Sequence, residues 1–242
     1  MSQPLIYANN GQYYDLVYGW KDYKKEVEII ERLITKFKTN SGNKLLDVGC
    51  GTGEHLKYIS KNYDCMGLDI NQKLLSIASR KNNDIEFRQG DMINFDIDMK
   101  FDVITLLFSA IGYVRTLENL EKTLKNLFNH LNTGGILIIE PWFNKKSKSF
   151  KVNVPFLTTF EGNDVKIARL SIAKIKGDFS IMDTHYLVAE NGGEVKHFSE
   201  KHTLGLFEKA DFLKIMKSVG FSPVFLDRGL NEEDRGLYLG TR

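Results

Sequence analysis

The chain has few of the features that mark secreted, membrane-spanning or nucleic-acid-binding proteins. Its 242 residues include 2 cysteines, Cys50 and Cys65, so a disulfide framework is not expected. No Cys/His spacing suggests a metal site, and no apolar run approaches the ~18 residues that a membrane span needs. The formal net charge of +2 is too small to favour nucleic acid as a partner.

The first seven residues also lack a basic region and a long apolar stretch, so we expect no signal peptide and a cytoplasmic location. The hydrophobic content of 42% and charged content of 26% are ordinary for a soluble globular protein. A chain of this length fits one large domain, or a core domain with an inserted lobe.

Apolar segments of strand and helix character alternate through the first 140 residues. The apolar spacing predicts helices at 22–38, 53–62, 71–81 and 117–131, the last ended by Gly134-Gly135, and strands at 44–48, 65–70, 85–89, 101–107 and 136–140. Such alternation is typical of an α/β fold with a doubly wound, mostly parallel, Rossmann-like sheet.

The pattern changes after Pro141. Residues 150–206 alternate with period 2 and contain turn signals at Gly177-Asp178 and 191–193, which predicts a small antiparallel β lobe. A helix at 209–219 and strands at 223–226 and 236–241 are expected to rejoin the main sheet. The predicted division is therefore a core of residues 1–149 and 207–242, with the lobe at 150–206.

A glycine-rich turn is the clearest functional signal in the chain. An apolar strand ends at Asp47, and Gly49, Gly51 and Gly53 follow at alternate positions before a helical pattern begins. A turn with so few side chains lets a ligand lie against main-chain N–H groups at a helix N-terminus. Asp69 ends the next strand, where a carboxylate can accept hydrogen bonds from both ribose hydroxyls. The pair indicates an adenosine-type cofactor.

The glycine spacing narrows the choice of cofactor. It is G-x-G-x-G, which differs from the dinucleotide G-x-G-x-x-G and from the P-loop, and the acidic Glu54 beside it suits a cationic or zwitterionic ligand. The sequence Leu46-Asp47-Val48-Gly49-Cys50-Gly51-Thr52-Gly53 resembles the first motif of class I S-adenosylmethionine (SAM) methyltransferases. The alternative is a tight strand-to-helix turn in another α/β protein.

Other candidate segments follow the third and fourth strands, and the carboxyl ends of all these strands should meet. Asp91 could accept from an adenine amino group while Met92 packs on the ring; the alternative for Asp91 is a turn cap. Residues 108–113 could wall in a reacting methyl group, or could be ordinary core.

The remaining aromatic and histidine residues are less specific. His185, His197 and His202 fall on predicted lobe strands and are interpreted as exposed or hydrogen-bonded histidines. The aromatic residues at 7–23 could close over the cofactor or pack on the first long helix.

Several longer motifs make the chain similar, nearly end to end, to the N,N-dimethyltransferases that act on nucleotide-linked 3-amino-deoxyhexoses. The motifs that carry this resemblance are Tyr14-Asp15-Leu16, Lys21-Asp22-Tyr23, Gly90-Asp91-Met92, Phe108-Ser109, Ile111-Gly112-Tyr113, Glu140-Pro141-Trp142, His197-Phe198-Ser199, Leu206-Phe207 and Arg235-Gly236-Leu237. The resemblance implies a SAM-dependent methyltransferase that releases S-adenosylhomocysteine, with the β lobe forming part of the acceptor site.

The resemblance also implies roles for individual residues. Asp69 would hold the ribose, Asp91 and Met92 the adenine, and the main chain near Phe108 the methionine amino group. The full set expected to bind the cofactor is Tyr14, Tyr23, Asp47, Gly49, Cys50, Gly51, Gly53, His55, Leu56, Asp69, Ile70, Asp91, Met92 and Phe108. Tyr7 and Tyr113 would be the catalytic residues at the amine, and Trp142 and Arg235 would border the sugar nucleotide.

The chain departs from that family at two places. Phe143 replaces a second Trp, and residues 230–234 place three acidic groups where the family has a Gly/Pro/Ser-rich segment; near a diphosphate these are unfavourable unless they point away.

We expect a small-molecule acceptor, neither nucleic acid nor membrane, and a monomer or homodimer. The alternatives are a methyltransferase for another N- or O-acceptor, or for a macromolecule, and a non-catalytic SAM-binding protein. Because the sulfonium already activates the methyl group, we expect no essential strong base; Tyr7 and Tyr113 would position the amine.

Overall fold

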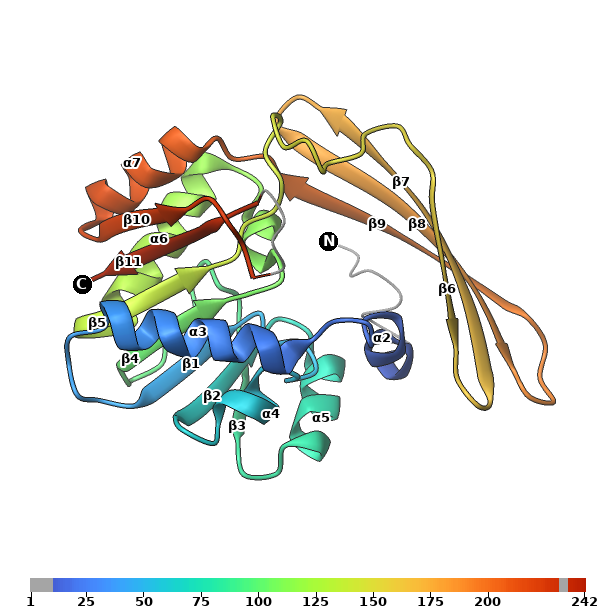
Figure 1. The fold of residues 1–242 in the computed structure, drawn as a ribbon, viewed down its shortest axis with the longest axis horizontal. Helices are drawn as coiled ribbons and strands as arrows, with labels where there is room; N and C mark the ends of the chain where they lie inside the picture. Colours follow the sequence, from blue (N-terminus) through green and yellow to red (C-terminus); the bar gives the residue numbers. More distant parts are fainter. Residues whose placement is uncertain (1–10, 231–234) are drawn as a thin grey trace.

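The computed structural model describes residues 11–230 and 235–242, which form two separate β-sheets (Figure 1). A seven-stranded, mostly parallel sheet carries helices on both faces, and a four-stranded antiparallel sheet extends from one end of it. This architecture confirms the predicted α/β fold with a small antiparallel sheet. None of the helices in the described residues is both long and apolar enough to cross a membrane.

The larger sheet has the strand order β3-β2-β1-β4-β5-β11-β10. Its strands are β1 (Lys44–Val48), β2 (Asp64–Asp69), β3 (Glu86–Gln89), β4 (Phe101–Leu106), β5 (Leu131–Ile139), β10 (Ser222–Leu226) and β11 (Leu237–Thr241). β11 pairs antiparallel with both β5 and β10, and the other neighbouring strands pair in parallel. The chain leaves β1 for β2 on one side and later returns to β4 on the other, and ligands of open α/β sheets bind beyond the carboxyl ends at such a switch point.

Both faces of the central strands are buried because neighbouring residues along each strand join different cores. Leu45 and Val103 belong to a core with the helices α3 (Tyr23–Phe37), α4 (Leu56–Ile59) and α5 (Gln72–Lys81). Leu46 and Ile104 belong to the opposite core with α6 (Leu117–His130) and α7 (Lys209–Val219). The continuous apolar runs of the sequence therefore produce a sheet that is covered on both sides.

Two predicted boundaries in this core were wrong. The helix expected at 53–62 is reduced to α4, a single turn. Gly134-Gly135 does not end α6; the helix ends at His130, β5 begins at once, and the glycines lie inside the strand. The pairing with β4 shifts register here, Gly134 has φ +77°, and a Cβ on Gly135 would approach the backbone oxygens of Asn132 and Asp102 to within 2.9 Å. The glycines therefore permit a bulge in place of a helix stop.

The smaller sheet is an antiparallel meander of β6 (Phe156–Glu161), β7 (Val165–Lys176), β8 (Phe179–Glu190) and β9 (Lys196–Gly205). The alternation is clearest in the sequence at 165–175, 180–189 and 194–204, which correspond to the last three strands, and β6 was not among the segments identified. Cross-strand pairs place Ser171, Thr184 and Glu200 side by side on one face, and all three are buried. This inner face is rich in polar groups, which an ordinary hydrophobic core would exclude.

Two short elements connect the sheets. Helix α2 (Gly11–Val17) lies beside the small sheet (Figure 1). It packs Tyr13 and Val17 on the inner face of that sheet, and the Tyr13 hydroxyl donates to Glu190 at 2.7 Å. The 3₁₀ helix η1 (Ala110–Val114) packs on β9, where a Cβ on Gly112 would lie 2.8 Å from Leu204. Tyr13 therefore packs on the lobe, which neither interpretation of the amino-terminal aromatic residues anticipated.

Candidate active site

The glycine turn after β1 bends in a way that side chains disfavour. Gly49, Gly51 and Gly53 have φ values of +75°, +56° and +75°, in the left-handed region. The N–H groups of Gly49 and Cys50 both donate to the carbonyl of Leu68, at 2.7 and 3.0 Å, and hold the turn against β2. A Cβ on Gly51 would have no other atom within 4 Å. The main chain at Gly51 is therefore open to a ligand.

Asp69 is attached directly to this turn. Its Oδ2 accepts from the Gly51 N–H and its Oδ1 accepts from the Asn71 N–H, both at 2.8 Å. Burial raises the pKa of the carboxyl, and the hydrogen bonds from the backbone partly offset that rise. Each carboxylate oxygen can accept more than one hydrogen bond, so Asp69 retains acceptor capacity for two ribose hydroxyls.

Asp47 at the end of β1 is almost fully buried. Its Oδ1 accepts from the Thr105 hydroxyl at 2.7 Å, and burial raises the pKa of the carboxyl to about 6. The structure therefore places it as a link between β1 and β4 at the base of the turn.

A buried charged cluster lies beside the turn, at the start of α3. Glu26 forms an ion pair with Lys21 and a 2.7 Å hydrogen bond with Nε2 of His55. Burial alone would raise the pKa of Glu26, but the hydrogen bond from His55 and the charge of Lys21 lower it to about 2. Tyr23 packs edge-on against His55, with ring centroids 4.9 Å apart. The expected cofactor residues His55 and Tyr23 thus share one network.

Sequence reasoning missed Lys21 and Glu26 as members of this cluster. The available signal was the position of Glu26 on the apolar stripe of α3, four residues before Ile30. The Lys21 ammonium also lies 4.8 Å from the centre of the Phe108 ring, which connects the cluster to the segment after β4.

Phe108 and Ser109 turn the chain sharply after β4. Both are non-glycine residues with positive φ, +50° and +64°, a conformation that surrounding contacts must maintain. The Phe108 N–H donates to Oε2 of Glu140 at 2.6 Å, and the Ser109 hydroxyl donates to the Pro141 carbonyl at 3.0 Å. This strained turn lies beside the region where the methyl group is expected.

Arg235 completes the support of this turn. Its guanidinium pairs with Oε1 of Glu140 at 3.3 Å, donates to the Ser109 hydroxyl at 2.7 Å, and lies 5.2 Å from the Phe143 ring centre. The side chain is buried. Its contact with a sugar nucleotide stays a prediction, whereas its role in holding residues 108–109 follows from the geometry.

The aromatic residues expected around the acceptor lie near η1. The Tyr113 ring is partly exposed, and its hydroxyl is 2.8 Å from Nδ1 of His202. Trp142 is half-buried, and a Cβ on Gly112 would lie 3.3 Å from its own Cβ, so Trp142 packs against the same helix. Tyr7, the other expected catalytic residue, falls outside the described residues, as does the acidic segment 231–234.

Tyr14 links the cofactor side of this region to the acceptor side. Burial raises the pKa of its phenol, and the nearby phenols of Tyr18, Tyr23 and Tyr113 and the carboxylate of Asp69 raise it further. Tyr14 therefore lies within electrostatic reach of both Asp69 and Tyr113.

The other expected cofactor residues differ in accessibility. Asp91 accepts from the Ile93 N–H at 2.9 Å, so the turn-cap interpretation holds for one of its oxygens, while Met92 packs at the edge of the core. Ile70 is exposed beside Asp69. Leu56 is fully buried and Cys50 is buried, and a Cβ on Gly53 would lie 2.9 Å from the side chain of Asn82.

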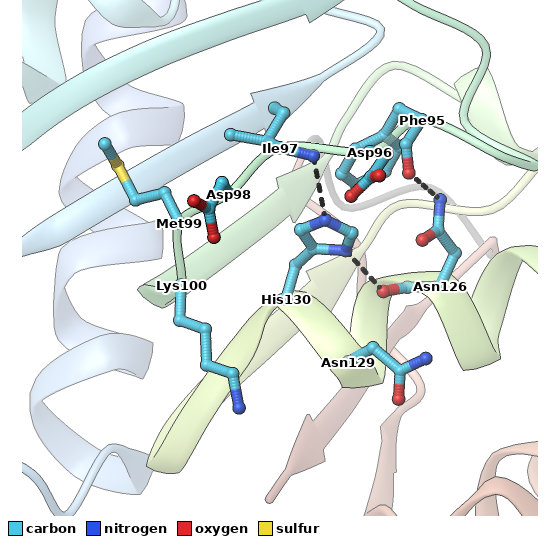
Figure 2. A pocket seen from close by; sticks show the side chains of 9 residues that line it. All are labelled: Phe95, Asp96, Ile97, Asp98, Met99, Lys100, Asn126, Asn129 and His130. Carbon is cyan, nitrogen blue, oxygen red and sulfur yellow. Dashed lines mark hydrogen bonds between the residues drawn. The ribbon is translucent and has the colours of Figure 1, made fainter.

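A separate hollow of about 530 Å³ lies at the opposite end of the sheet, between residues 95–100 and the end of α6 (Figure 2). Its histidine, His130, is bonded through both ring nitrogens, to the Ile97 N–H at 3.2 Å and the Asn126 carbonyl at 2.9 Å. Both ring nitrogens of His130 are therefore already occupied by backbone groups.

Comparison with known proteins identifies the relatives of this chain. A methyltransferase domain model matches residues 45–135, from β1 to β5. The dTDP-3-amino-3,4,6-trideoxy-alpha-D-glucopyranose N,N-dimethyltransferase of Streptomyces venezuelae is 32% identical over 237 residues, covering 97% of this chain and 98% of the relative. The dTDP-3-amino-3,6-dideoxy-alpha-D-glucopyranose N,N-dimethyltransferase of Streptomyces fradiae is 30% identical, covering 94% and 88%.

Solved structures of methyltransferases are also similar to this chain. The crystal structure of DesVI from Streptomyces venezuelae superposes with a TM-score of 0.89 at 31% identity, covering 97% of this chain and 98% of that one. The SAM-bound structure of CalS10, an amino pentose methyltransferase from Micromonospora echinaspora, gives a TM-score of 0.83 at 26% identity, covering 95% and 96%.

Proposed function

This chain belongs to the SAM-dependent methyltransferase family that includes the dTDP-amino-sugar N,N-dimethyltransferases, and from that premise we propose that it methylates the amine of a nucleotide-linked amino sugar. SAM is its cofactor and S-adenosylhomocysteine its product. We further propose that the enzyme acts in the cytoplasm, on a small acceptor and without a nucleic-acid partner, in keeping with its net charge of +2.

The observation that carries the acceptor proposal is the polar inner face of the small sheet, reached from the same side as Tyr113. Ser171, Thr184 and Glu200 lie along that face, between its contacts with α2 and with η1. A hydroxylated sugar can exchange hydrogen bonds with such groups in addition to the 3.0 Å bonds that they already make, Ser171 to Thr184 and Glu200 to His202. We propose that residues 150–206 form this wall of the acceptor site.

The reaction needs orientation more than activation. The amine nitrogen attacks the methyl carbon of SAM, the new N–C bond forms as the S–C bond breaks, and the sulfonium becomes a neutral thioether. Holding the two reactants in line can contribute roughly 7–11 kcal/mol. The turn at Gly51 and the carboxylate of Asp69 would hold SAM, and Tyr113 would meet the amine.

The test is a panel of acceptors incubated with SAM and analysed by mass spectrometry. The panel contains dTDP-linked amino sugars, the same sugars with a hydroxyl in place of the amine, and simple amines without a nucleotide. We expect methylation of the dTDP-amino sugars only. Methylation of the hydroxylated sugars or of glycine-like amines would overturn the acceptor assignment, and SAM binding without any product would indicate a non-catalytic protein.

A further inference from the structure

A buried histidine–glutamate pair lies directly behind Tyr113. The Tyr113 hydroxyl is 2.8 Å from Nδ1 of His202, and Nε2 of the same ring is 3.0 Å from Oε2 of Glu200. The side chains of His202 and Glu200 are 4% and 0% exposed, while Tyr113 is 38% exposed. The three groups therefore form a hydrogen-bonded relay that runs from the interior of the small sheet to its surface beside the site.

The chemistry of the three groups fixes which of them donates each hydrogen bond in this relay. A carboxylate has no proton to donate, so Glu200 accepts from the Nε2–H of His202. The Nδ1 of a neutral imidazole in that tautomer carries a lone pair, which leaves Tyr113 as the donor of the 2.8 Å bond. With its proton directed at His202, the phenol oxygen of Tyr113 presents its lone pairs to any group in front of it.

We propose that His202 and Glu200 are positioning residues that orient the Tyr113 hydroxyl to accept an N–H of the substrate amine, an inference that rests on the proposed function. An amine that donates one hydrogen to Tyr113 is held in a defined orientation. Its lone pair can then be aligned with the methyl group.

The same relay can accept the proton that the methylated amine must lose. After transfer, the product is a secondary ammonium. One of its protons passes to the Tyr113 oxygen while the phenol proton moves to Nδ1 of His202, and the resulting imidazolium is stabilised by Glu200 before it loses the proton to water. Bonds and charges balance without any further reactant.

The experiment compares Tyr113→Phe, His202→Gln, Glu200→Gln and the double variant Tyr113→Phe/His202→Gln, using the dTDP-amino sugar that the wild type methylates. We expect each single variant to lower kcat about tenfold. The double variant should have a kcat no lower than the single variants, because each change interrupts the same hydrogen-bonded relay. The KM for SAM should not change, so the loss should appear in kcat.

His197→Gln is the matched control, since this histidine lies on the exposed face of the same strand and its replacement should leave kcat unchanged. Additive losses in the double variant, or a kcat for His202→Gln within twofold of wild type, would overturn the proposal. A loss confined to the KM for SAM would do the same.

A measurement without substrate keeps the test independent of the acceptor. Nitrogen NMR of labelled histidine should show His202 protonated at Nε2, with an Nδ1 signal that shifts in Tyr113→Phe. In Glu200→Gln the amide can donate to Nε2, so the tautomer should reverse. An Nδ1-protonated ring in the wild type overturns the proposal, whereas a failure to methylate any amino sugar overturns the proposed function instead.

Discussion

The guanidinium of Arg235 donates a 2.7 Å hydrogen bond to the hydroxyl of Ser109, although 126 positions separate the two residues. The same guanidinium pairs with Glu140, whose carboxylate accepts from the Phe108 N–H. Three segments that resemble family motifs in the sequence, at 108–109, 140–142 and 235–237, therefore meet at one strained turn. These contacts hold the main chain at residues 108–109 in place.

Replacing Arg235 should destabilise the fold. Arg235→Leu would leave the carboxylate of Glu140 buried without its counter-charge, which typically costs about 3–5 kcal/mol of unfolding free energy. Urea unfolding measures the loss, with the exposed Arg228→Leu as a control that should change little. A loss below about 1 kcal/mol would show that the Glu140 ion pair does not hold this turn.

At Gly51, the effect of a side chain on SAM binding can be separated from its effect on stability through the left-handed backbone conformation. Gly51 and Gly177 have φ values of +56° and +61°, and a Cβ at either position would have nothing within 4 Å. Alanine at either position should therefore cost a similar ~1–2 kcal/mol of stability. Only Gly51→Ala should weaken SAM binding, by at least about tenfold in calorimetry. Equal SAM affinities in the two variants would place the cofactor elsewhere.

Asp69→Ala should abolish SAM binding. Two hydrogen bonds from ribose hydroxyls to a charged acceptor, at roughly 1.5 kcal/mol or more each, correspond to about 100-fold or more in affinity. Asp64→Ala, at the exposed start of the same strand, provides the control and should bind SAM normally. Retained affinity in Asp69→Ala would contradict the cofactor site as built here.

Asp47 should make stability depend on pH. Burial raises the pKa of this carboxyl to about 6 in the folded chain, above the ordinary value of 3.8. Its protonated form therefore favours folding below about pH 4, and this contribution is lost as the pH rises through 6. Asp47→Asn, which can still accept from Thr105, should raise the free energy of unfolding by as much as about 3 kcal/mol at pH 8.

The gain from Asp47→Asn should shrink to almost nothing near pH 4, where the wild-type carboxyl is protonated in the folded state. Asp64→Asn should show no such dependence, because Asp64 is exposed. Urea unfolding at the two pH values measures both variants. A gain that is equal at pH 4 and pH 8 would contradict a raised pKa.

Much of the fold could be predicted because local patterns agree with the final packing. The helix predicted at 209–219 is α7, and the apolar runs ending at Asp47 and near Asp69 are β1 and β2. The errors arose where tertiary contacts override local signals. Gly134-Gly135 looks like a helix stop but forms a bulge against β4, and β6 carries too little alternation to show without its partner β7.

The candidate site divides in the same way. The glycine turn and Asp69 could be predicted as neighbours because both follow adjacent strands, and they are joined by the 2.8 Å bond at Gly51. His202 was interpreted as one of several lobe histidines, and its pairing with Tyr113 and Glu200 was not foreseen. Tyr113 lies on a different element from His202, 89 positions away in the sequence, and no short-range pattern connects those two residues.

The sequence by itself determined the doubly wound core, the turn with its alternating glycines, and the acidic group one strand away, because strand periodicity and glycine conformation act over a few residues. Only the tertiary structure decided which charged and polar side chains are paired: Lys21 and His55 with Glu26, Arg235 with Glu140, and Tyr113 with His202. Burial forces such groups to find partners, and the partners are set by the packing of distant elements.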